Sequence, residues 1–586
     1  MSDFLYSNKR IKPGKLTTEI HKIYHDENPS VKEFHGKWGS LAVSHNLYNG
    51  YQPYETEDYI FVVVGGPILY FRDNDFIEDD NSNAGTIEIY NLWKKGRVKW
   101  DEDLSGPFSI IIINKQTLDL QFITDLMSFI PVYVYQDSTN TILSTHVDAL
   151  ASVSNQKMNY DTISCADFIL HGVVTFPYTL YKGVYQVKPA SVHQVINKSN
   201  ELKSNAYWIP KEEYKYSALK NAADDLEKSL RKYINSITSQ VSNIAQFISG
   251  GEDSRVLSSL LQHYPRDAFI FLDQMNREGK IAEKAANTYG ANFKQGTRSK
   301  THYIKILPNC SDLVGSGSQY HHAHTFGFHK SCNLNKYSAV FGGLFSDALL
   351  KGIRIKKIHH SDRLPLIPDI KNRKYSIEID TDNNIFNKEI LKELSNRRKA
   401  HLNYVKKFRN ESAEEWFELW PSSMNMNIPN IHANRRLFRS YEPFMANDVV
   451  KISASVPQKW KLNRRLFHKA TKHLLKPTKW LFHSDGRLPY FPWHINSILK
   501  FTYKVYSKAG KKTGIIKGNQ GPWAEWKKVV NSKEWDKAIL ENSKGFQKIS
   551  SIFKEKDIEK LLQDDNIFFL QRVNLMQILY QIRSKA

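Results

Sequence analysis

Ser249-Gly250-Gly251-Glu252-Asp253-Ser254-Arg255 joins two segments of different pattern. Before it, residues 244–248 (IAQFI) form a short apolar run that predicts a buried strand. After it, residues 253–264 (DSRVLSSLLQHY) place apolar side chains on one face of a helix, at Val256, Leu257, Leu260 and Leu261. A strand, a glycine turn and a helix in this order predict one unit of a parallel, helix-covered sheet.

The residue types of this loop suit the binding of a phosphate chain. Its two glycines let the backbone turn sharply and approach an anion closely, and the following helix opens with unpaired N–H groups. The loop lacks the Gly-Lys-Ser/Thr of a P-loop. Asp253 is either a magnesium ligand or the cap of the helix. We therefore expect a phosphate chain to bind at Ser249, Gly250, Gly251, Asp253, Ser254 and Arg255.

The segments after the loop continue the alternation of strands and helices. Residues 268–272 form a second apolar strand, a helix follows, and a third strand ends at Val340-Phe341. From about residue 385 onward the pattern is mostly helical.

The first 210 residues have a different character. Runs of β-branched and aromatic residues alternate with turn residues, which predicts a β-rich half with few helices. These runs cover residues 59–64, 108–113, 120–123 and 132–135. The pattern changes near Trp208-Ile209-Pro210, after which an apolar stripe at helical spacing begins. The sequence thus predicts two domains, residues 1–210 and residues 211–586.

Composition and charge narrow the class of protein. The chain has 586 residues, a hydrophobic fraction of 41% and three cysteines without a C-x-x-C pair, which favours a globular protein in a reducing cytoplasm. No apolar stretch reaches the roughly 20 residues that cross a bilayer, so we expect no membrane partner. The formal net charge is +22. Because Lys and Arg are spread along the chain, a basic surface is favoured over nucleic-acid binding, which stays open.

The string S-G-G-x-D-S, after a strand and before a helix, resembles the pyrophosphate-binding loop of the N-type ATP pyrophosphatases. Leu104-Ser105-Gly106-Pro107-Phe108 is similar to the L-x-G-x-F strand of the asparagine synthetases, and Glu442-Pro443-Phe444-Met445 resembles their R-x-P-F-L segment. The resemblance to this superfamily, which includes β-lactam synthetases and lasso-peptide cyclases, runs in order from about residue 50 to 495. It implies an Ntn-type α+β sandwich, then a doubly wound ATP pyrophosphatase domain that uses ATP and Mg²⁺ to adenylate a carboxylate. It also implies that ATP binds at Ser249, Gly250, Gly251, Asp253, Ser254 and Arg255, with its adenine ring against the ends of the first two strands, near Phe247, Phe271 and Leu272.

The sequence departs from this family near its start. A working amidotransferase half needs a Cys directly after the initiator Met, because its thiolate attacks glutamine. Here that residue is Ser2, and the first cysteine is Cys165. The resemblance therefore implies an N-terminal domain without glutaminase activity, and ammonia or an amine of the substrate would supply the nucleophile.

Two further departures concern acids and cations. Residues 342–347 (GGLFSD) stand where the family has G-D-G-x-D-E, so only Asp347 remains of that acidic set. Asp347 is either a catalytic residue and metal ligand together with Asp253, or a helix cap. The catalytic Lys of the family aligns with Arg465, for which Lys469 or Lys461 could substitute. The alternative is that these three are surface cations on a helix.

Two other clusters invite an interpretation. His321, His322 and His324 lack the flanking Cys or carboxylate of a usual metal site, so a loop that lines the substrate pocket is favoured over a metal site. Residues 351–363 (KGIRIKKIHHSDR) are densely basic. They form a lid over ATP, a grip on an acidic substrate, or a solvated loop.

Together these features predict an ATP-dependent, AMP-forming ligase that joins a small-molecule or peptide carboxylate to ammonia or an amine. One alternative is a tRNA- or nucleotide-modifying ATP pyrophosphatase, which the net charge favours. The other is a non-catalytic nucleotide-binding protein derived from a synthetase, which the acids missing at Gly343 and Ser346 favour.

Overall fold

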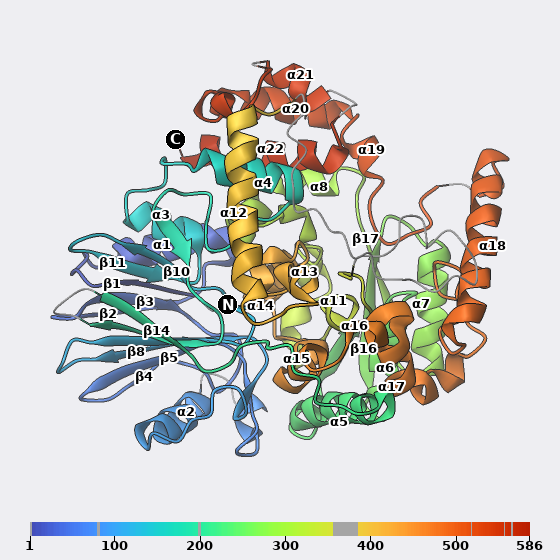
Figure 1. Ribbon diagram of the computed structural model, residues 1–586, viewed down its shortest axis with the longest axis horizontal. Helices are drawn as coiled ribbons and strands as arrows, with labels where there is room; N and C mark the ends of the chain where they lie inside the picture. The colour runs from blue at the N-terminus through green and yellow to red at the C-terminus, as the bar shows by residue number, and fades with distance from the viewer. Residues whose placement is uncertain are drawn as a thin grey trace.

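The computed structural model describes residues 3–78, 82–196, 201–355, 385–516, 518–555, 557–563 and 567–585. Its N-terminal part is a sandwich of two antiparallel sheets (Figure 1). The first sheet has the strand order β12 (Val184–Gln186), β10 (Tyr133–Gln136), β11 (Thr141–Ser144), β1 (Phe4–Ser7), β3 (Gly39–Ser44), β2 (Val31–Gly36). The second has the order β14 (Glu201–Ala206), β13 (Ser191–Ile196), β9 (Leu120–Thr124), β8 (Phe108–Asn114), β5 (Tyr59–Gly65), β4 (Tyr54–Glu55). A short ribbon pairs β6 (Ile68–Leu69) with β7 (Leu104–Ser105).

The two sheets bury one apolar layer between them. Val62 of β5 lies opposite Ile111 of β8, and both belong to a buried cluster that also contains residues of the first sheet. Because successive side chains of a strand point to opposite faces, the alternate residues face outward and meet helices. Helix α2 (Ala84–Lys94) packs beside β5, and α1 (Lys15–Tyr24) and α3 (Val147–Val153) cover the first sheet. The four layers of an α+β sandwich result.

The second part contains a parallel sheet of five strands. Their order is β17 (Asn292–Thr297), β16 (Arg266–Leu272), β15 (Ile244–Phe247), β18 (Ala339–Phe341), β19 (Ser440–Tyr441), and every neighbouring pair is parallel. The chain first builds outward from β15 to β17 and then returns to the other side of β15 with β18. The strand order therefore reverses between β15 and β18.

Helices cover both faces of this sheet. Ile244 of β15 is buried with α5 (Leu219–Thr238) and α6 (Glu252–Leu260) on one face, and the next residue, Ala245, is buried with α9 (Leu307–Val314) and α14 (Ile428–Leu437) on the other. Helix α7 (Arg277–Thr288) packs beside β16 and β17. The predicted doubly wound, parallel architecture is thus confirmed for this part of the chain.

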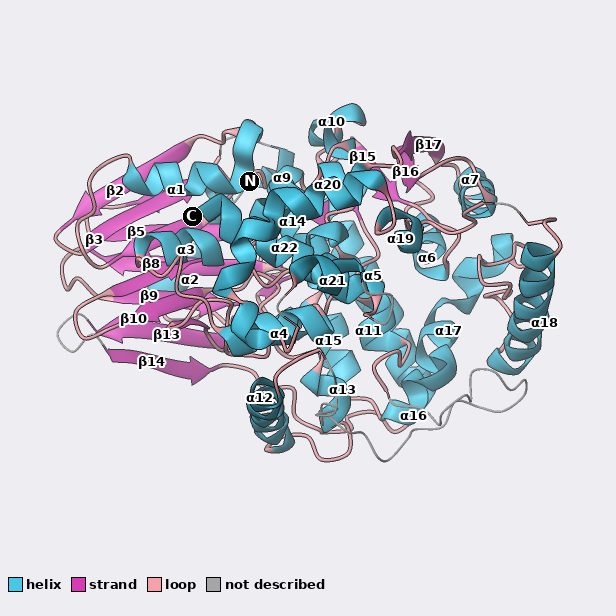
Figure 2. Ribbon diagram, turned by 90° about the horizontal axis from the view of Figure 1, so that it is seen from above, coloured by secondary structure: helices cyan, strands magenta, loops and turns pink. Residues whose placement is uncertain are grey.

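The C-terminal region is mostly helical, as predicted. Viewed from above, helices fill the half of the molecule opposite the sandwich (Figure 2). The helices not yet mentioned are α4 (Thr162–His171), α8 (His302–Lys305), α10 (Phe328–Ser331), α11 (Ser346–Leu350), α12 (Lys388–Lys406), α13 (Ala413–Phe417), α15 (Asn447–Ala454), α16 (Gln458–Lys461), α17 (Arg465–Thr471), α18 (Trp493–Lys512), α19 (Trp526–Val529), α20 (Lys533–Asn542), α21 (Ile558–Gln563) and α22 (Phe569–Lys585). Among the described residues, we find no helix that combines the length and the apolar character needed to span a membrane.

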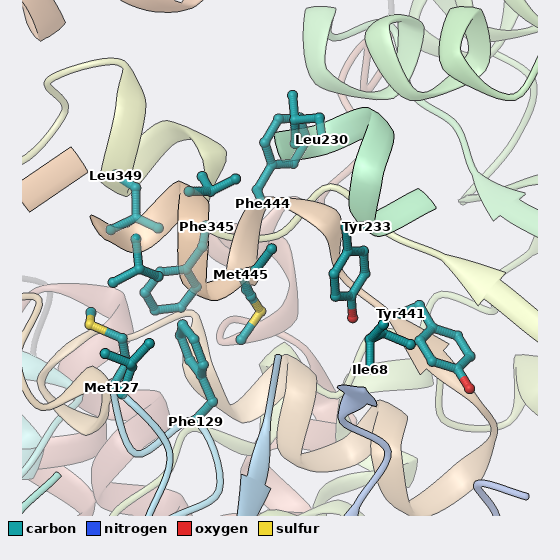
Figure 3. Packing of buried hydrophobic residues seen from close by; sticks show 14 of the residues in the cluster. Ile68, Met127, Phe129, Leu230, Tyr233, Phe345, Leu349, Tyr441, Phe444 and Met445 are labelled. Atoms are coloured by element: carbon teal, nitrogen blue, oxygen red, sulfur yellow. The ribbon is translucent and has the colours of Figure 1, made fainter. Parts of the chain in front are cut away.

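The two parts share one apolar core (Figure 3). Phe129 of the sandwich meets Phe345 edge to face, with ring centroids 5.2 Å apart. Phe345 directly precedes α11 and has a left-handed backbone (φ 71°). Tyr48 of the sandwich donates a hydrogen bond to the carbonyl of Ser440 in β19 (2.8 Å). The sandwich therefore supports the loop and strand that carry residues 342–347 and Glu442. The domain boundary at residue 210 stays a prediction.

A buried ion pair joins the beginning of β1 to α14. The Asp3 carboxylate accepts hydrogen bonds from Arg436 (2.7 and 2.8 Å) and Arg435 (3.0 Å), and all three side chains are almost completely buried. Burial alone would raise the pKa of Asp3, but the two guanidinium groups hold it well below its usual value. The start of the sandwich is thereby fixed to the second part of the molecule.

Candidate active site

A cavity of 470 Å³ opens at the carboxyl ends of the parallel strands. It lies where the strand order reverses, which is the usual ligand position in doubly wound sheets. Residues at the ends of four strands line it: most of the loop 249–254 after β15, Phe271 near the end of β16, Gly342 and Gly343 after β18, and Glu442 after β19. The sequence-predicted loop is therefore at the place where this architecture binds ligands.

Hydrogen bonds fix the loop before α6. The Ser249 N–H donates to Ser254 Oγ (3.1 Å), and the Gly251 N–H donates to Ser249 Oγ (3.1 Å). The Gly250 N–H donates to Glu278 Oε1 at the start of α7 (2.6 Å). These three N–H groups, which were expected to face phosphate, thus have side-chain acceptors. The two hydroxyls are also engaged, because Ser254 Oγ donates to the Ser249 carbonyl (3.2 Å) and lies 3.1 Å from Ser249 Oγ. The donors that remain for an anion are the first-turn N–H groups of α6, which have no acceptor within the helix.

Arg255 is not a phosphate contact in this arrangement. Its guanidinium donates to the carbonyls of Gly250 (3.1 Å), Leu481 (2.7 Å) and Phe482 (2.6 Å), and the side chain is fully buried. Burial lowers the pKa of Arg255 to about 10. The residue instead ties the loop to the segment that leads into His483, which is itself part of the cavity lining. This corrects the sequence-based expectation for Arg255.

Three carboxylates and one lysine form a compact cluster beside the loop. Lys351 Nζ lies 3.1 Å from Glu252, 3.0 Å from Asp347, and in contact with Asp253. Burial raises the pKa of Asp253, and the attraction of Lys351 opposes that rise. The predicted metal ligands Asp253 and Asp347 are brought together, but they contact an ammonium group. As placed, these two carboxylates fit a lysine rather than a magnesium ion.

Arg464, which directly precedes α17, is a cation that lines the cavity. Its Nε lies 2.9 Å from Glu252. Arg464 has a left-handed backbone (φ 62°), as does the preceding Asn463 (φ 54°). Arg465 and Lys469, the predicted catalytic cations, are exposed on α17 and do not line the cavity.

Two other cations near the cluster have different surroundings. Lys461, the second substitute considered, is buried in a pair with Glu415 (2.7 Å) and lies outside the cavity lining. Arg487 lines the cavity, where it bonds to Asp485 (2.7 Å) and lies 3.7 Å from Glu252. Arg487 thus adds positive charge next to the loop, and no sequence pattern pointed to it.

Aromatic and histidine side chains form the other end of the cavity. Phe247 and Phe271 line it, and Phe271 stacks on Phe328 with centroids 4.2 Å apart. Leu272, which was also predicted to lie near adenine, is completely buried and does not line the cavity. His324 lines the cavity, with its ring 4.3 Å from that of Trp523. Burial holds the pKa of His324 well below its usual value, so the ring is neutral.

No metal cluster accompanies these histidines. Within the described ranges, no group of three or more His, Cys, Asp or Glu side chains is arranged to hold a metal ion. His321 packs against Trp526 with ring centroids 5.1 Å apart and does not line the cavity. For the basic stretch, a lid over ATP, a grip on an acidic substrate and a solvated loop were all left open. Its part from residue 356 to 363 lies outside the described residues.

Glu442 is a buried carboxylate that sequence reasoning missed as a functional residue. It accepts hydrogen bonds from the Leu344 N–H (2.9 Å) and from Ser440 Oγ (3.1 Å). Burial raises the pKa of Glu442 to about 7. A side chain on Gly342 would collide with this carboxylate, because a Cβ there would lie 2.2 Å from Glu442 Oε1. A group that titrates near neutral pH in a cavity is a candidate proton acceptor.

Comparisons with known proteins identify the N-terminal sandwich. Residues 40–208 match the family model of the glutamine amidotransferase domain. This region is therefore similar to glutamine amidotransferase domains. The match leaves the parallel-sheet part of the chain outside it.

Solved structures and curated proteins add two findings. Similar structures include glutamine phosphoribosylpyrophosphate (PRPP) amidotransferase from B. subtilis complexed with ADP and GMP, at 12% identity and a TM-score of 0.24, covering 50% of this chain and 66% of that one. Another, described as the allosteric regulatory enzyme of purine biosynthesis, has 10% identity and a TM-score of 0.25, covering 50% of this chain and 80% of that one. A search of curated proteins finds no match.

Proposed function

We propose that this chain activates a carboxylate with ATP as an acyl-adenylate, releases pyrophosphate, and transfers the acyl group to ammonia or an amine. The observation that carries the proposal is the placement of the loop 249–254. It meets two cavity-lining arginines, Arg464 and Arg487, at the switch point of a doubly wound sheet. A second, less polar end with Phe247 and Phe271 would take the base. One cavity thus offers an anion-binding end and an aromatic end.

The chemistry consists of two displacements. An oxygen of the substrate carboxylate attacks the α-phosphorus, the bond to the β-phosphate breaks, and pyrophosphate leaves. The amine then attacks the acyl carbon, the bond to AMP breaks, and the amine loses a proton. Arg464 and Arg487 would stabilise the negative charge of the leaving pyrophosphate, and Glu442 would accept the proton from the amine. The cavity would contribute mainly by positioning the reactants.

We further propose that the N-terminal domain does not hydrolyse glutamine through a thiol. The three cysteines of the sequence are Cys165, Cys310 and Cys332, and burial raises the pKa of the first two. A thiol with a raised pKa is a poor nucleophile. Ser2, where the family has its nucleophile, lies outside the described residues. The neighbouring Asp3 is fully engaged by Arg435 and Arg436, which gives this end of the sandwich a structural role.

The proposal is tested by following the fate of ATP. The purified chain is incubated with α-labelled ATP, an ammonium salt and a panel of carboxylates that includes aspartate, sugar acids and peptides. We expect AMP and pyrophosphate with at least one carboxylate, and their loss in a Ser249→Ala, Ser254→Ala double variant. Formation of ADP and phosphate instead, or no binding of ATP at millimolar concentration, would refute the proposal. Glutamate formation from glutamine would refute the statement about the N-terminal domain.

A second candidate is a nucleotide-binding protein without catalysis. The specific observation in its favour is Lys351, whose ammonium lies between the two carboxylates expected to hold metal. Binding of ATP without release of pyrophosphate on any carboxylate would favour this alternative.

A further inference from the structure

Lys351 is a buried cation surrounded by acids. It follows α11 directly, and its side chain is only 3% exposed. Its ammonium contacts Glu252, Asp253 and Asp347, and it lies 4.5 Å from the centroid of the Phe467 ring. The ammonium thus lies among three carboxylates, and an aromatic face borders the group.

Local sequence explains how the cluster forms. Asp347 and Lys351 are four residues apart, so α11 places them on the same face. Glu252 and Asp253 open α6, where the helix dipole favours acids. The segment before α11 runs close to α6, since a Cβ at Gly343 would lie in van der Waals contact with Asp253 Cβ (3.4 Å). Two helix ends from distant parts of the sequence therefore converge on one ammonium group.

The charge state of the lysine follows from these contacts. Burial disfavours an ammonium ion, and an unpaired one would lose its proton. The adjacent Asp253, Glu252 and Asp347 outweigh this effect and hold the pKa of Lys351 above its usual value. The cluster is therefore a set of carboxylates that already contains its cation.

A magnesium ion would need the same place. Mg²⁺ takes oxygen ligands at about 2.0–2.1 Å in near-octahedral geometry, and any ion shared by Asp253 and Asp347 would have to displace the Lys351 ammonium that both contact. We propose that Lys351 replaces the protein-bound divalent cation of this site, so that Asp253 and Asp347 serve as partners of a lysine rather than as metal ligands.

One consequence follows for a bound nucleotide, and it rests on the proposed function. Lys351 and Arg464 would offset the carboxylates that a polyphosphate must approach, so the anion-binding end would not depend on a metal held by the protein. The lysine–carboxylate cluster itself is independent of that function and can be tested without nucleotide.

The test is the binding of Mn²⁺ alone to the full-length chain, followed by electron paramagnetic resonance of the free ion. We expect the wild-type protein to leave the Mn²⁺ signal unchanged up to 1 mM, as an order-of-magnitude ceiling. Lys351→Met removes the ammonium and keeps the apolar stem. This variant should bind one Mn²⁺ per chain with a Kd on the order of 0.1–1 mM, the range of weak carboxylate sites.

Two control variants separate a created site from nonspecific binding. Adding Asp347→Asn to Lys351→Met should abolish the new site, because one of the two shared carboxylates is lost. Lys459→Met, which removes a lysine from the exposed surface of α16, should bind no more Mn²⁺ than the wild type. A thermal unfolding scan should show that Mn²⁺ raises the Tm of Lys351→Met and leaves that of the wild type unchanged.

Two outcomes would overturn the inference. The first is stoichiometric binding of Mn²⁺ to the wild-type chain that Asp347→Asn abolishes, a measurement that does not depend on how well any lysine variant folds. The second is a folded Lys351→Met variant that binds no Mn²⁺. If the Mn²⁺ results are as expected but no carboxylate yields pyrophosphate, the lysine inference stands and the proposed reaction fails.

Discussion

Arg464 and Arg465 are adjacent in the sequence but differ in their surroundings, which allows a matched test of the anion-binding end. Arg464 lines the cavity and contacts Glu252, whereas Arg465 is exposed on α17. We predict that Arg464→Met weakens the binding of ATP and of inorganic pyrophosphate. Arg465→Met should leave both affinities within about twofold, because a surface cation contributes little.

The size of the effect follows from the contacts of Arg464. A hydrogen bond to a charged group contributes about 1.5–3 kcal/mol. Because 31% of the Arg464 side chain is exposed, we take the lower part of that range, about 1.5–2 kcal/mol, as the binding energy lost in Arg464→Met. This loss corresponds to a roughly 10- to 30-fold rise in the Kd of ATP and of pyrophosphate. In Arg464→Met, Glu252 still pairs with Lys351 at 3.1 Å. The acid therefore keeps a partner, and the variant should remain folded.

Isothermal titration calorimetry of ATP and of pyrophosphate measures these affinities, with circular dichroism to show that both variants are folded. The effect should weaken at high salt, because a partly exposed contact is screened. Equal losses of affinity in the two variants, or a larger loss in Arg465→Met, would show that the phosphate chain does not bind next to Arg464.

Three further predictions concern stability and pH. Asp3→Asn should lower the free energy of unfolding, measured in urea, by about 3–5 kcal/mol, because it leaves two buried arginines without their acid. Since the pKa of Asp3 is lowered on folding, this stabilisation is present above the ordinary pKa of 3.8 and is lost as the pH falls. A loss of stability below ~1 kcal/mol would contradict the role of the ion pair. Glu442 has a pKa raised from 4.5 to about 7, so wild-type stability should fall as the pH rises through that window, and Glu442→Gln should flatten this dependence in thermal scans at pH 5 and pH 8; an unchanged slope would exclude Glu442 as the titrating group. Phe129→Ala should cost about 3–5 kcal/mol and also weaken ATP binding, because Phe129 supports Phe345 at the start of α11; a loss of stability with unchanged ATP affinity would separate the interface from the site.

The architecture was readable from local patterns. The run predicted over residues 59–64 is β5 (Tyr59–Gly65), and the run over residues 244–248 is β15 (Ile244–Phe247) followed by the loop. These segments are buried on both sides, so their apolar character is continuous and independent of distant partners. The alternation of strands and helices along the sequence then predicted a parallel sheet, because parallel strands need crossover connections.

Side-chain roles were harder to predict, because they depend on distant segments. Arg255 is next to the loop in sequence, but its hydrogen-bond acceptors include Leu481 and Phe482, more than 200 residues away. The sequence named Arg465 and gave no sign that Arg464 lines the cavity, because the left-handed turn at Asn463 rotates the chain before α17 begins. No short-range pattern indicates either feature.

Lys351 is the exception, since a local signal was present. It follows Asp347 by four residues, a spacing that places both side chains on one helix face. The sequence alone favoured a role for Lys351 in a basic stretch with its C-terminal neighbours, because charge density is the more visible pattern. What the sequence cannot show is that α6 brings two more carboxylates to the same point, which converts a surface pair into a buried cluster.

The amidotransferase-type domain has a structural role that does not require glutamine hydrolysis. Phe129 supports the left-handed residue that begins α11, and α11 carries Asp347 and leads into Lys351. The Tyr48 hydroxyl holds the carbonyl of Ser440, two residues before Glu442. Removing the sandwich would expose the apolar core that both parts share and release both of these segments at once. The second part of the chain therefore depends on the sandwich for the geometry of its own cavity, whether or not the sandwich hydrolyses glutamine.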